Sequence, residues 1–271
     1  MQTILITGTG SGIGQATAKL FARKGWCVFA TDRKRASSPA GKNTVPMLLD
    51  VNDPRAIANA FKAIKEQADH LDCVVNNAGW GLFLPFEDTT QKETEEMYRT
   101  NVFGLMEVTR HACAIMRKQK GGTIINISSV AGQRGSPLYS VYASTKWAVE
   151  GFSEALAHEM RALGVHVKIV EPGRVKTAFF DRAYGQETLK RISDPYRAMC
   201  ERKIQKHRAS LASDAASAED VAQIIFSAAT DGSWRLRYPV GKEAETILQA
   251  KHTQNDQEFF EEVYKEFTSP S

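Results

Sequence analysis

Short apolar runs alternate along the chain with longer stretches in which apolar residues recur every three or four positions. Short β-branched runs are typical of buried strands, and the longer spacing is typical of amphipathic helices. The pattern predicts strands at 3–7, 26–32, 45–50, 72–79, 121–129 and 165–173. It predicts helices at about 12–24, after Pro54, at about 91–117 and at about 139–163.

The regular alternation of strand and helix predicts βαβ units and therefore a buried parallel sheet. Since no internal repeat or low-complexity linker interrupts the series, we expect a single α/β domain over residues 1–271. The expected architecture is a doubly wound Rossmann fold, with about seven parallel strands and helices on both faces. In such folds, ligands bind at the carboxyl ends of the strands, where the winding direction reverses.

Composition narrows the classes of protein that fit this fold. The 271 residues are 42% hydrophobic and 24% charged, with a formal net charge of +4. So small a charge does not indicate a nucleic-acid partner. The lack of a long apolar run and of an export signal predicts a cytoplasmic protein without a transmembrane segment. The four cysteines and six histidines lack metal-ligand spacing, which predicts reduced thiols and no metal site.

Four glycines, at positions 8, 10, 12 and 14, join the first predicted strand to the first predicted helix. Their spacing does not match the G-x-G-x-x-G dinucleotide fingerprint in any register. A helix N-terminus at this turn nevertheless offers unpaired N–H groups and a partial positive charge to a pyrophosphate. A glycine-rich turn that merely packs closely is the alternative.

A series of short motifs follows in order along the chain. Residues 7–14 read T-G-x-x-x-G-I-G, and NNAG, TNVFG, INISS, YASTK and PGRVKT come after them. The series resembles the signature of the short-chain dehydrogenase/reductase family over about residues 3–180. The resemblance implies an oxidoreductase that transfers hydride between a nicotinamide cofactor and a small alcohol or ketone. None of these motifs departs from the family pattern.

Tyr142 and Lys146 stand four positions apart in a predicted helix, so their side chains share one face. A tyrosine with its ordinary pKa of about 10 is a poor general base at neutral pH. A cation fixed beside the phenolate lowers that pKa. The pair therefore predicts Tyr142 as proton donor and acceptor and Lys146 as its electrostatic partner. Tyr139 has no lysine at this offset. An ordinary exposed helix pair is the alternative.

The family resemblance implies two further catalytic residues. Ser129, thirteen positions before Tyr142, matches the serine that polarises the substrate oxygen. Ser128 is the other candidate, but strand alternation turns it away from the same site. Asn101 resembles the asparagine that holds a water for proton relay to Lys146. An asparagine that satisfies a break in a helix backbone is compatible with that role.

The resemblance also implies which residues contact the cofactor. Lys146 is expected at the nicotinamide ribose, and Asp50, at the end of the third strand, at the adenine amino group. The implied cofactor residues are Gly8, Ser11, Gly12, Ile13, Gly14, Asp32, Arg33, Asp50, Val51, Asn77, Ala78, Gly79, Tyr142, Lys146, Pro172, Gly173, Val175 and Thr177.

The choice between NAD and NADP depends on Asp32, which ends the second predicted strand. A carboxylate there accepts hydrogen bonds from both adenosine-ribose hydroxyls and repels a 2′-phosphate, which favours NAD. Arg33 is able to clamp that phosphate, so NADP is also possible. Ser11 stands where many NADP-using relatives carry a basic residue, and on balance we predict NAD.

Residues 178–217 occupy the position of the family's substrate lid, and residues 243–271 form a predicted helical tail. The lid is rich in Lys and Arg, which indicates either a solvated pair of helices or a site for an acidic substrate or an acyl-carrier partner. Acidic residues interleave the apolar stripe of the tail. That pattern favours a helix docked on the protein over one lying on a membrane.

The substrate and the assembly follow from the same resemblance. Trp80, Phe83, Leu138, Phe179 and Phe180 are predicted pocket walls. FATDR and RYPVG resemble the hydroxysteroid and retinol dehydrogenase branch, which implies an apolar secondary alcohol or ketone. The alternatives are an NADPH-dependent 3-oxoacyl reductase and a nicotinamide-binding sensor without turnover. Relatives pair through their two long helices, which implies a homodimer or homotetramer.

Overall fold

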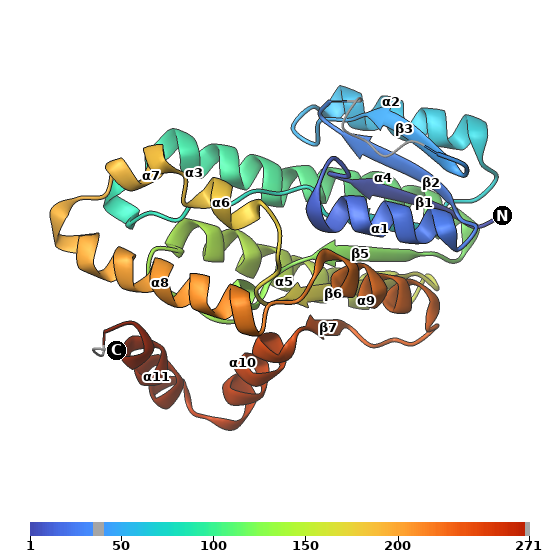
Figure 1. Cartoon of the computed structure of the whole chain (residues 1–271). Helices are drawn as coiled ribbons and strands as arrows, with labels where there is room; N and C mark the ends of the chain where they lie inside the picture. The colour runs from blue at the N-terminus through green and yellow to red at the C-terminus, as the bar shows by residue number, and fades with distance from the viewer. Residues whose placement is uncertain (35–40, 269–271) are drawn as a thin grey trace.

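The computed structural model of the chain describes residues 1–34 and 41–268, so the end of the predicted tail, 269–271, lies outside the described residues. Within the described part, seven parallel strands form one sheet in the order β3-β2-β1-β4-β5-β6-β7 (Figure 1). The strands are β1 (Thr3–Thr7), β2 (Cys27–Asp32), β3 (Thr44–Leu48), β4 (Cys73–Asn76), β5 (Thr123–Ile127), β6 (His166–Pro172) and β7 (Arg237–Val240). The winding reverses between β1 and β4, which confirms the doubly wound fold and locates its ligand-binding edge.

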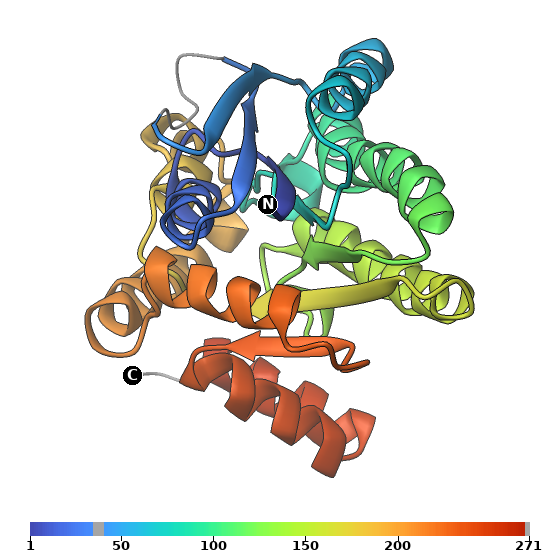
Figure 2. The same ribbon diagram turned by 90° about the vertical axis from the view of Figure 1, so that its right-hand side faces the viewer.

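Helices cover both faces of the sheet, as Figure 2 shows. On one face, α1 (Gly12–Arg23) packs against α9 (Ala218–Thr230). On the other face lie α2 (Pro54–Gln67), α4 (Leu105–Gln119) and α5 (Ser140–Arg161). Because the strands are parallel, their carboxyl ends all lie along the same edge of the sheet.

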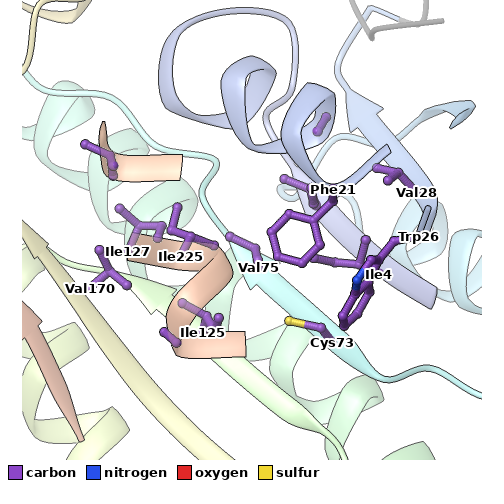
Figure 3. Close-up of a cluster of buried hydrophobic side chains, with 14 of the residues drawn as sticks. Ile4, Phe21, Trp26, Val28, Cys73, Val75, Ile125, Ile127, Val170 and Ile225 are labelled. Carbon is purple, nitrogen blue, oxygen red and sulfur yellow. The ribbon is translucent and has the colours of Figure 1, made fainter. Parts of the chain in front are cut away.

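Neighbouring strand residues serve opposite faces and build a core on each. Ile4 packs with Phe21 of α1 and Ile225 of α9 in the core of Figure 3. Leu5, one position later, packs with Phe61 of α2 on the opposite face. Because side chains alternate along a strand, a sheet buried on both faces needs continuous apolar runs, and these are the runs that the sequence shows.

The predicted helix at 91–117 is not one regular helix. α3 (Gln91–Tyr98) continues through a π-helical turn, η3 (Arg99–Gly104), into α4. Apolar spacing does not reveal the extra residue in such a turn. The third strand also differs from its prediction: β3 ends at Leu48, so Asp50 lies in the following loop, where its Oδ1 accepts a hydrogen bond from the Asn52 N–H at 2.9 Å.

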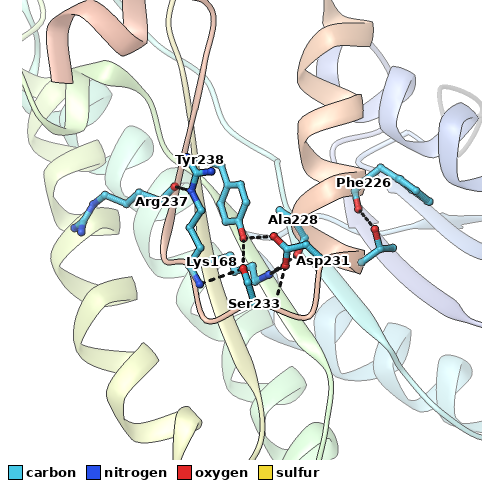
Figure 4. A network of polar contacts seen from close by, with 9 residues as sticks. Lys168, Phe226, Ala228, Asp231, Ser233, Arg237 and Tyr238 are labelled. Atoms are coloured by element: carbon cyan, nitrogen blue, oxygen red, sulfur yellow. Dashed lines mark hydrogen bonds and ion pairs between the residues drawn. The ribbon is translucent and has the colours of Figure 1, made fainter. Parts of the chain in front are cut away.

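A polar network ties the end of the sheet together (Figure 4). Lys168 of β6 has a side chain only 2% exposed, and its Nζ donates to the carbonyl of Ala228 at 2.8 Å and to Asp231 at 2.5 Å. The Tyr238 hydroxyl of β7 donates to the same carboxylate at 2.6 Å. The network joins β6, β7 and the end of α9, because a buried ammonium needs such partners.

The segment after β6 forms α6 (Phe179–Ala183), α7 (Gln186–Lys190) and the longer α8 (Arg197–Ser213). After β7, α10 (Lys242–Thr253) and α11 (Asp256–Thr268) turn back toward α8, and α11 packs against it (Figure 1). In the part of the chain that the structure describes, no helix has the length and apolarity to cross a bilayer.

Candidate active site

A cavity of about 720 Å³ lies at the carboxyl ends of the strands, bounded by the glycine turn at one end and by α6 and α8 at the other. This volume is in the usual range of small-molecule sites. All the predicted cofactor residues except Gly14 line the cavity. Of the predicted catalytic residues, Ser129, Tyr142 and Lys146 line it and Asn101 does not.

The glycines of the first turn allow three backbone segments to approach closely. Gly8 has a φ of +73°, and a Cβ there would lie 2.9 Å from the Cα of Ala78. A Cβ on Gly14 would lie only 2.2 Å from the Gly8 carbonyl oxygen. Gly14 therefore lies beneath the cavity wall, where the lack of a side chain lets α1 pack closely against the turn. Ser11 precedes α1 without capping it by its side chain, which leaves the first N–H groups of α1 for an anion.

Two predicted cofactor side chains bind the protein backbone at this end. The Asn77 amide donates to the carbonyls of Thr7 at 2.9 Å and Gly8 at 3.0 Å, so it holds the glycine turn in shape. The Asp32 carboxylate accepts from the Gly10 N–H at 3.1 Å and from the Lys34 N–H at 3.2 Å. Both residues still line the cavity, where Asp32 faces the turn.

Tyr142 and Lys146 lie one turn apart near the start of α5, and Ser129 follows β5. The Ser129 hydroxyl donates to the Pro172 carbonyl at 3.4 Å, and it acts against the burial that raises the pKa of Tyr142. The Lys146 Nζ donates to the Ile127 carbonyl at 2.8 Å and lies 5.9 Å from the centroid of the Tyr142 ring. Ser129 also accepts from the Ala131 N–H at 3.2 Å, which fixes its hydroxyl at the start of a short 3₁₀ turn. Ser128 is buried and faces Glu150, away from the phenol.

The phenol is not made acidic in this structure, contrary to the expectation from the sequence. Burial raises the pKa of Tyr142 to about 12, and the Ser129 hydroxyl acts in the opposite direction. The rings of Phe83 and Phe179 pack around the phenol and keep water from it. Burial likewise lowers the pKa of Lys146 to about 8, against the attraction of Glu150. An ammonium bonded to the main chain at that distance does not offset the desolvation of a phenolate.

Asn101 lies behind the cavity wall, in η3, and is 1% exposed. Its Nδ2 donates to the Trp80 carbonyl at 2.9 Å and to the Thr145 hydroxyl at 3.2 Å, and its Oδ1 accepts from the Trp80 N–H at 3.0 Å. Asn101 therefore fixes the loop that carries Trp80 to the cavity. It satisfies the backbone of that loop rather than that of its own helix.

Aromatic side chains form the wall beyond Tyr142, and four of the five predicted wall residues line the cavity: Trp80, Phe83, Phe179 and Phe180. Leu138 is instead buried in a separate cluster with Leu84. The sequence analysis missed Tyr139, whose ring stacks on Phe83 with centroids 3.9 Å apart. Because Tyr139 lies about one helical turn before Tyr142, its position in the sequence could have indicated that it lines the cavity.

Four ionisable residues at this end of the cavity were not predicted as site residues from the sequence. Arg134, Arg174, His207 and Glu243 line the cavity from separate loops and helices. Burial, then the charges of Arg174 and Lys203, lower the pKa of His207 to about 4, so it is neutral at pH 7. Except for Arg174, which lies within the PGRVKT motif, no local motif marks these residues, because the fold alone brings them together.

Known proteins resemble both the sequence and the fold. Residues 2–188 match the family model described as short chain dehydrogenase. A 3-ketodihydrosphingosine reductase of Bacteroides thetaiotaomicron is 38% identical over 180 residues, 66% of each chain. A short-chain dehydrogenase of Streptomyces avermitilis has a TM-score of 0.81 at 28% identity, covering 98% of this chain and 96% of that one. ElxO with NADP bound has a TM-score of 0.71 at 26% identity, covering 88% and 97%. The chain therefore belongs to the short-chain dehydrogenase/reductase family and is an NAD(P)-dependent oxidoreductase.

Proposed function

We propose that the chain interconverts a secondary alcohol and a ketone, with Tyr142 as the proton donor and acceptor. The observation that supports this most directly is that Tyr142, Ser129 and Lys146 together line the cavity that the glycine turn borders. A bound nicotinamide supplies or accepts the hydride. The protein's own part is to hold the substrate oxygen and to move one proton.

The residues around the cavity fit a nicotinamide dinucleotide. The close approach at Gly8 and Gly14 leaves backbone in place of side chains, and the N-terminus of α1 suits a pyrophosphate. Lys146 would hold the nicotinamide ribose, and Asp50 with Val51 would line the adenine. The other cofactor residues named from the sequence line the same cavity, apart from Gly14 beneath it.

Three side chains would carry the proton chemistry. A substrate oxygen would accept hydrogen bonds from both Tyr142 and Ser129, because both side chains line the same cavity. Because burial raises its pKa to about 12, Tyr142 keeps its proton at neutral pH and can give it to the oxygen of a ketone. Lys146 contributes positive charge beside it, and Asn101 positions the Trp80 loop and, as in relatives, would hold a relay water.

Replacement of Tyr142 tests the assignment. We expect Tyr142→Phe to lower kcat by about 10²–10⁴-fold over a panel of steroids, retinoids, 3-oxoacyl thioesters and small ketones, with cofactor affinity retained. Tyr98→Phe, outside the cavity, is the control. Full turnover by Tyr142→Phe would refute its role. Tight cofactor binding by the wild type without any turnover would favour the sensor without catalysis.

NAD is the proposed cofactor, supported by the Asp32 carboxylate at the cavity wall, which would meet the adenosine ribose and repel a 2′-phosphate. Arg33 and Lys34, which also line the cavity, are the reason to keep NADP as the second candidate. Asp32→Ala should improve kcat/KM with NADPH, and Asp69→Ala, an exposed site, should not. A wild-type preference for NADPH above about tenfold would contradict the assignment.

The proposed substrate has an apolar body, supported by the aromatic wall of Phe83, Phe179 and Phe180. A hydroxysteroid or retinoid has such a body. A 3-oxoacyl compound reduced with NADPH is the second candidate, favoured by the cations at the same end of the cavity. We further propose that 1–271 is a single domain in which 178–217 is the substrate lid and 243–271 the tail.

A further inference from the structure

The cavity is strongly basic beyond Tyr142. Among the residues that the structure describes, its lining there carries five basic side chains and one acidic side chain, Glu243. The basic residues are Arg134, Arg174, Arg182, Lys203 and Lys206. They come from the loop after β5, the loop after β6 and helices α6 and α8, so no single amphipathic helix face accounts for the charge.

Two acidic residues of the tail form ion pairs with Arg134 and Arg174. Glu266 of α11 places a carboxylate oxygen 3.2 Å from Arg134 Nη1, and its backbone carbonyl accepts from Lys206. Glu243, at the start of α10, lies 2.8 Å from Arg174 Nη1 and also accepts from the Arg174 backbone N–H at 2.9 Å. The Glu243 carboxylate therefore binds Arg174 through two contacts, whereas the Glu266 carboxylate binds Arg134 through one.

Part of the positive charge is shielded from solvent, although Arg182 is exposed. The side chain of Arg134 is 13% exposed, and that of Arg174 is 22% exposed. Lys203 donates to the Pro137 carbonyl and lies 3.6 Å from the centroid of the Tyr139 ring. Burial, with the charge of Arg134, holds the pKa of Lys203 well below its usual value. Guanidinium groups so placed are suited to a carboxylate or phosphate, which they bind in a fork.

We propose that the substrate is a ketone or secondary alcohol with an apolar body and one anionic group, which binds Arg134 in the place that Glu266 occupies here. This inference rests on the proposed function, since the Tyr142 hydroxyl fixes where the carbonyl lies. The aromatic wall then takes the body, and Arg134 and Arg174 take the acid. The Glu266 side chain, 34% exposed, is the group that the substrate displaces.

A matched pair of ketones tests the charge. We expect 5-oxo-5-phenylpentanoate to have a KM at least about tenfold below that of its methyl ester, and added salt to raise the KM of the acid alone. Arg134→Gln should bring the two KM values together. Glu266→Gln should lower the KM of the acid, because the competing carboxylate loses its charge. Arg208→Gln, exposed on α8, and Glu245→Gln, exposed on α10, are the matched controls.

Binding without turnover separates this inference from the reaction itself. Calorimetry with 4-phenylbutyrate and with 3-phenylpropylphosphonate should show binding that Arg134→Gln weakens about tenfold, and the tighter ligand tells carboxylate from phosphate. Anion binding that depends on Arg134, without ketone turnover, would support the anion site and refute the reaction. Turnover that favours the ester, or anion binding that Arg134→Gln does not change, would refute the anion site and leave the oxidoreductase standing.

Discussion

The charge of Lys146 is expected to change near neutral pH. Burial lowers its pKa to about 8, so the ammonium is present below that value and is lost as the pH rises through it. Tyr142, with a pKa of about 12, stays protonated over the same range. We therefore expect kcat/KM for ketone reduction to fall above about pH 8.

The matched variant for this pH profile is Lys146→Arg, which keeps its charge throughout the range. Its kcat/KM should be lower than that of the wild type but independent of pH between about 7 and 10. Steady-state rates with saturating cofactor measure both profiles. A wild-type profile that is level to pH 10 would mean that Lys146 keeps its proton or does not matter for reduction.

Glu171 is a buried acidic residue in strand β6, next to Pro172 of the cavity wall. Its side chain is fully buried, its Oε1 accepts from Gln133 at 3.2 Å, and the Arg237 Nε lies 3.8 Å away. Burial, together with the neighbouring Glu150 carboxylate, raises the pKa of Glu171 to about 7. Arg237 pairs more closely with Glu150, at 3.0 Å, and so does not neutralise both acids.

The raised pKa of Glu171 predicts how stability changes with pH. Between 4.5 and about 7 the folded state keeps a proton that the unfolded state has lost, so the free energy of unfolding falls as the pH rises. Glu171→Gln should remove roughly 1–3 kcal/mol of that fall. Urea unfolding at pH 5 and pH 7.5 measures it, with Glu159→Gln as an exposed control on α5. Equal slopes for wild type and Glu171→Gln would show that Glu171 is ionised in the folded protein.

At the scale of single residues, the sequence predicted the site residues that lie within local motifs. Tyr142 and Lys146 share a helix face, and Ser129 lies just after strand β5, so neighbours along the chain determine their places. The pKa of Tyr142 was predicted in the wrong direction because it depends on the rings that surround the phenol, which come from distant segments. Arg134 was missed because its partner, Glu266, lies 132 positions away.

At the scale of elements, the Lys168 network joins strands β6 and β7 to the end of α9. Lys168→Met keeps the volume of the side chain but leaves Asp231 without its cation. We expect a loss of about 1–3 kcal/mol in the free energy of unfolding, less than for a fully buried pair because the Asp231 side chain is 32% exposed. Lys62→Met, which removes an exposed pair with Glu66, should cost under about 0.5 kcal/mol. Chemical denaturation that gives equal losses would refute the contribution of burial.

The elements themselves were largely predictable, because periodicity reports which faces are buried. Strand β1 and the helix after Pro54 appear as expected. The failures occur where the backbone departs from a regular period. The turn η3 adds a residue without changing the apolar character of the segment, and β3 stops before Asp50 because that side chain bonds to the following loop. Neither deviation changes the order of elements.

At the scale of the whole molecule, the parallel, doubly wound sheet followed from the alternation of elements. The return of α11 to α8 did not, since a helix docked at the far side of the molecule has the same pattern of apolar and acidic residues. That return decides which cations of the cavity meet tail carboxylates. The sequence therefore predicted the part of the site that surrounds Tyr142 better than the part that is expected to select the substrate.

Assembly is the property of the whole molecule that a single residue can test. The family resemblance implies pairing through the two long helices, and Phe103, near the junction of η3 and α4, is 61% exposed. We expect a homodimer or homotetramer in solution, and Phe103→Asp should weaken it at least about tenfold because a charge would enter the apolar interface. Phe260→Asp, 64% exposed on α11, is the control. Sedimentation velocity measures both, and an unchanged distribution for Phe103→Asp would refute this interface.

Because the π-helical turn joins α3 to α4, a change in the number of its residues would rotate α3 relative to α4. A helix rotates by about 100° for each residue, so deletion of one residue from 99–104 would swing α3 by that angle about the axis of α4. Met97, which is fully buried, would then face solvent, and a residue from the exposed face of α3 would take its buried position. Substitutions here alter one contact, whereas a shortened chain would demand a new polarity pattern over all eight residues of α3.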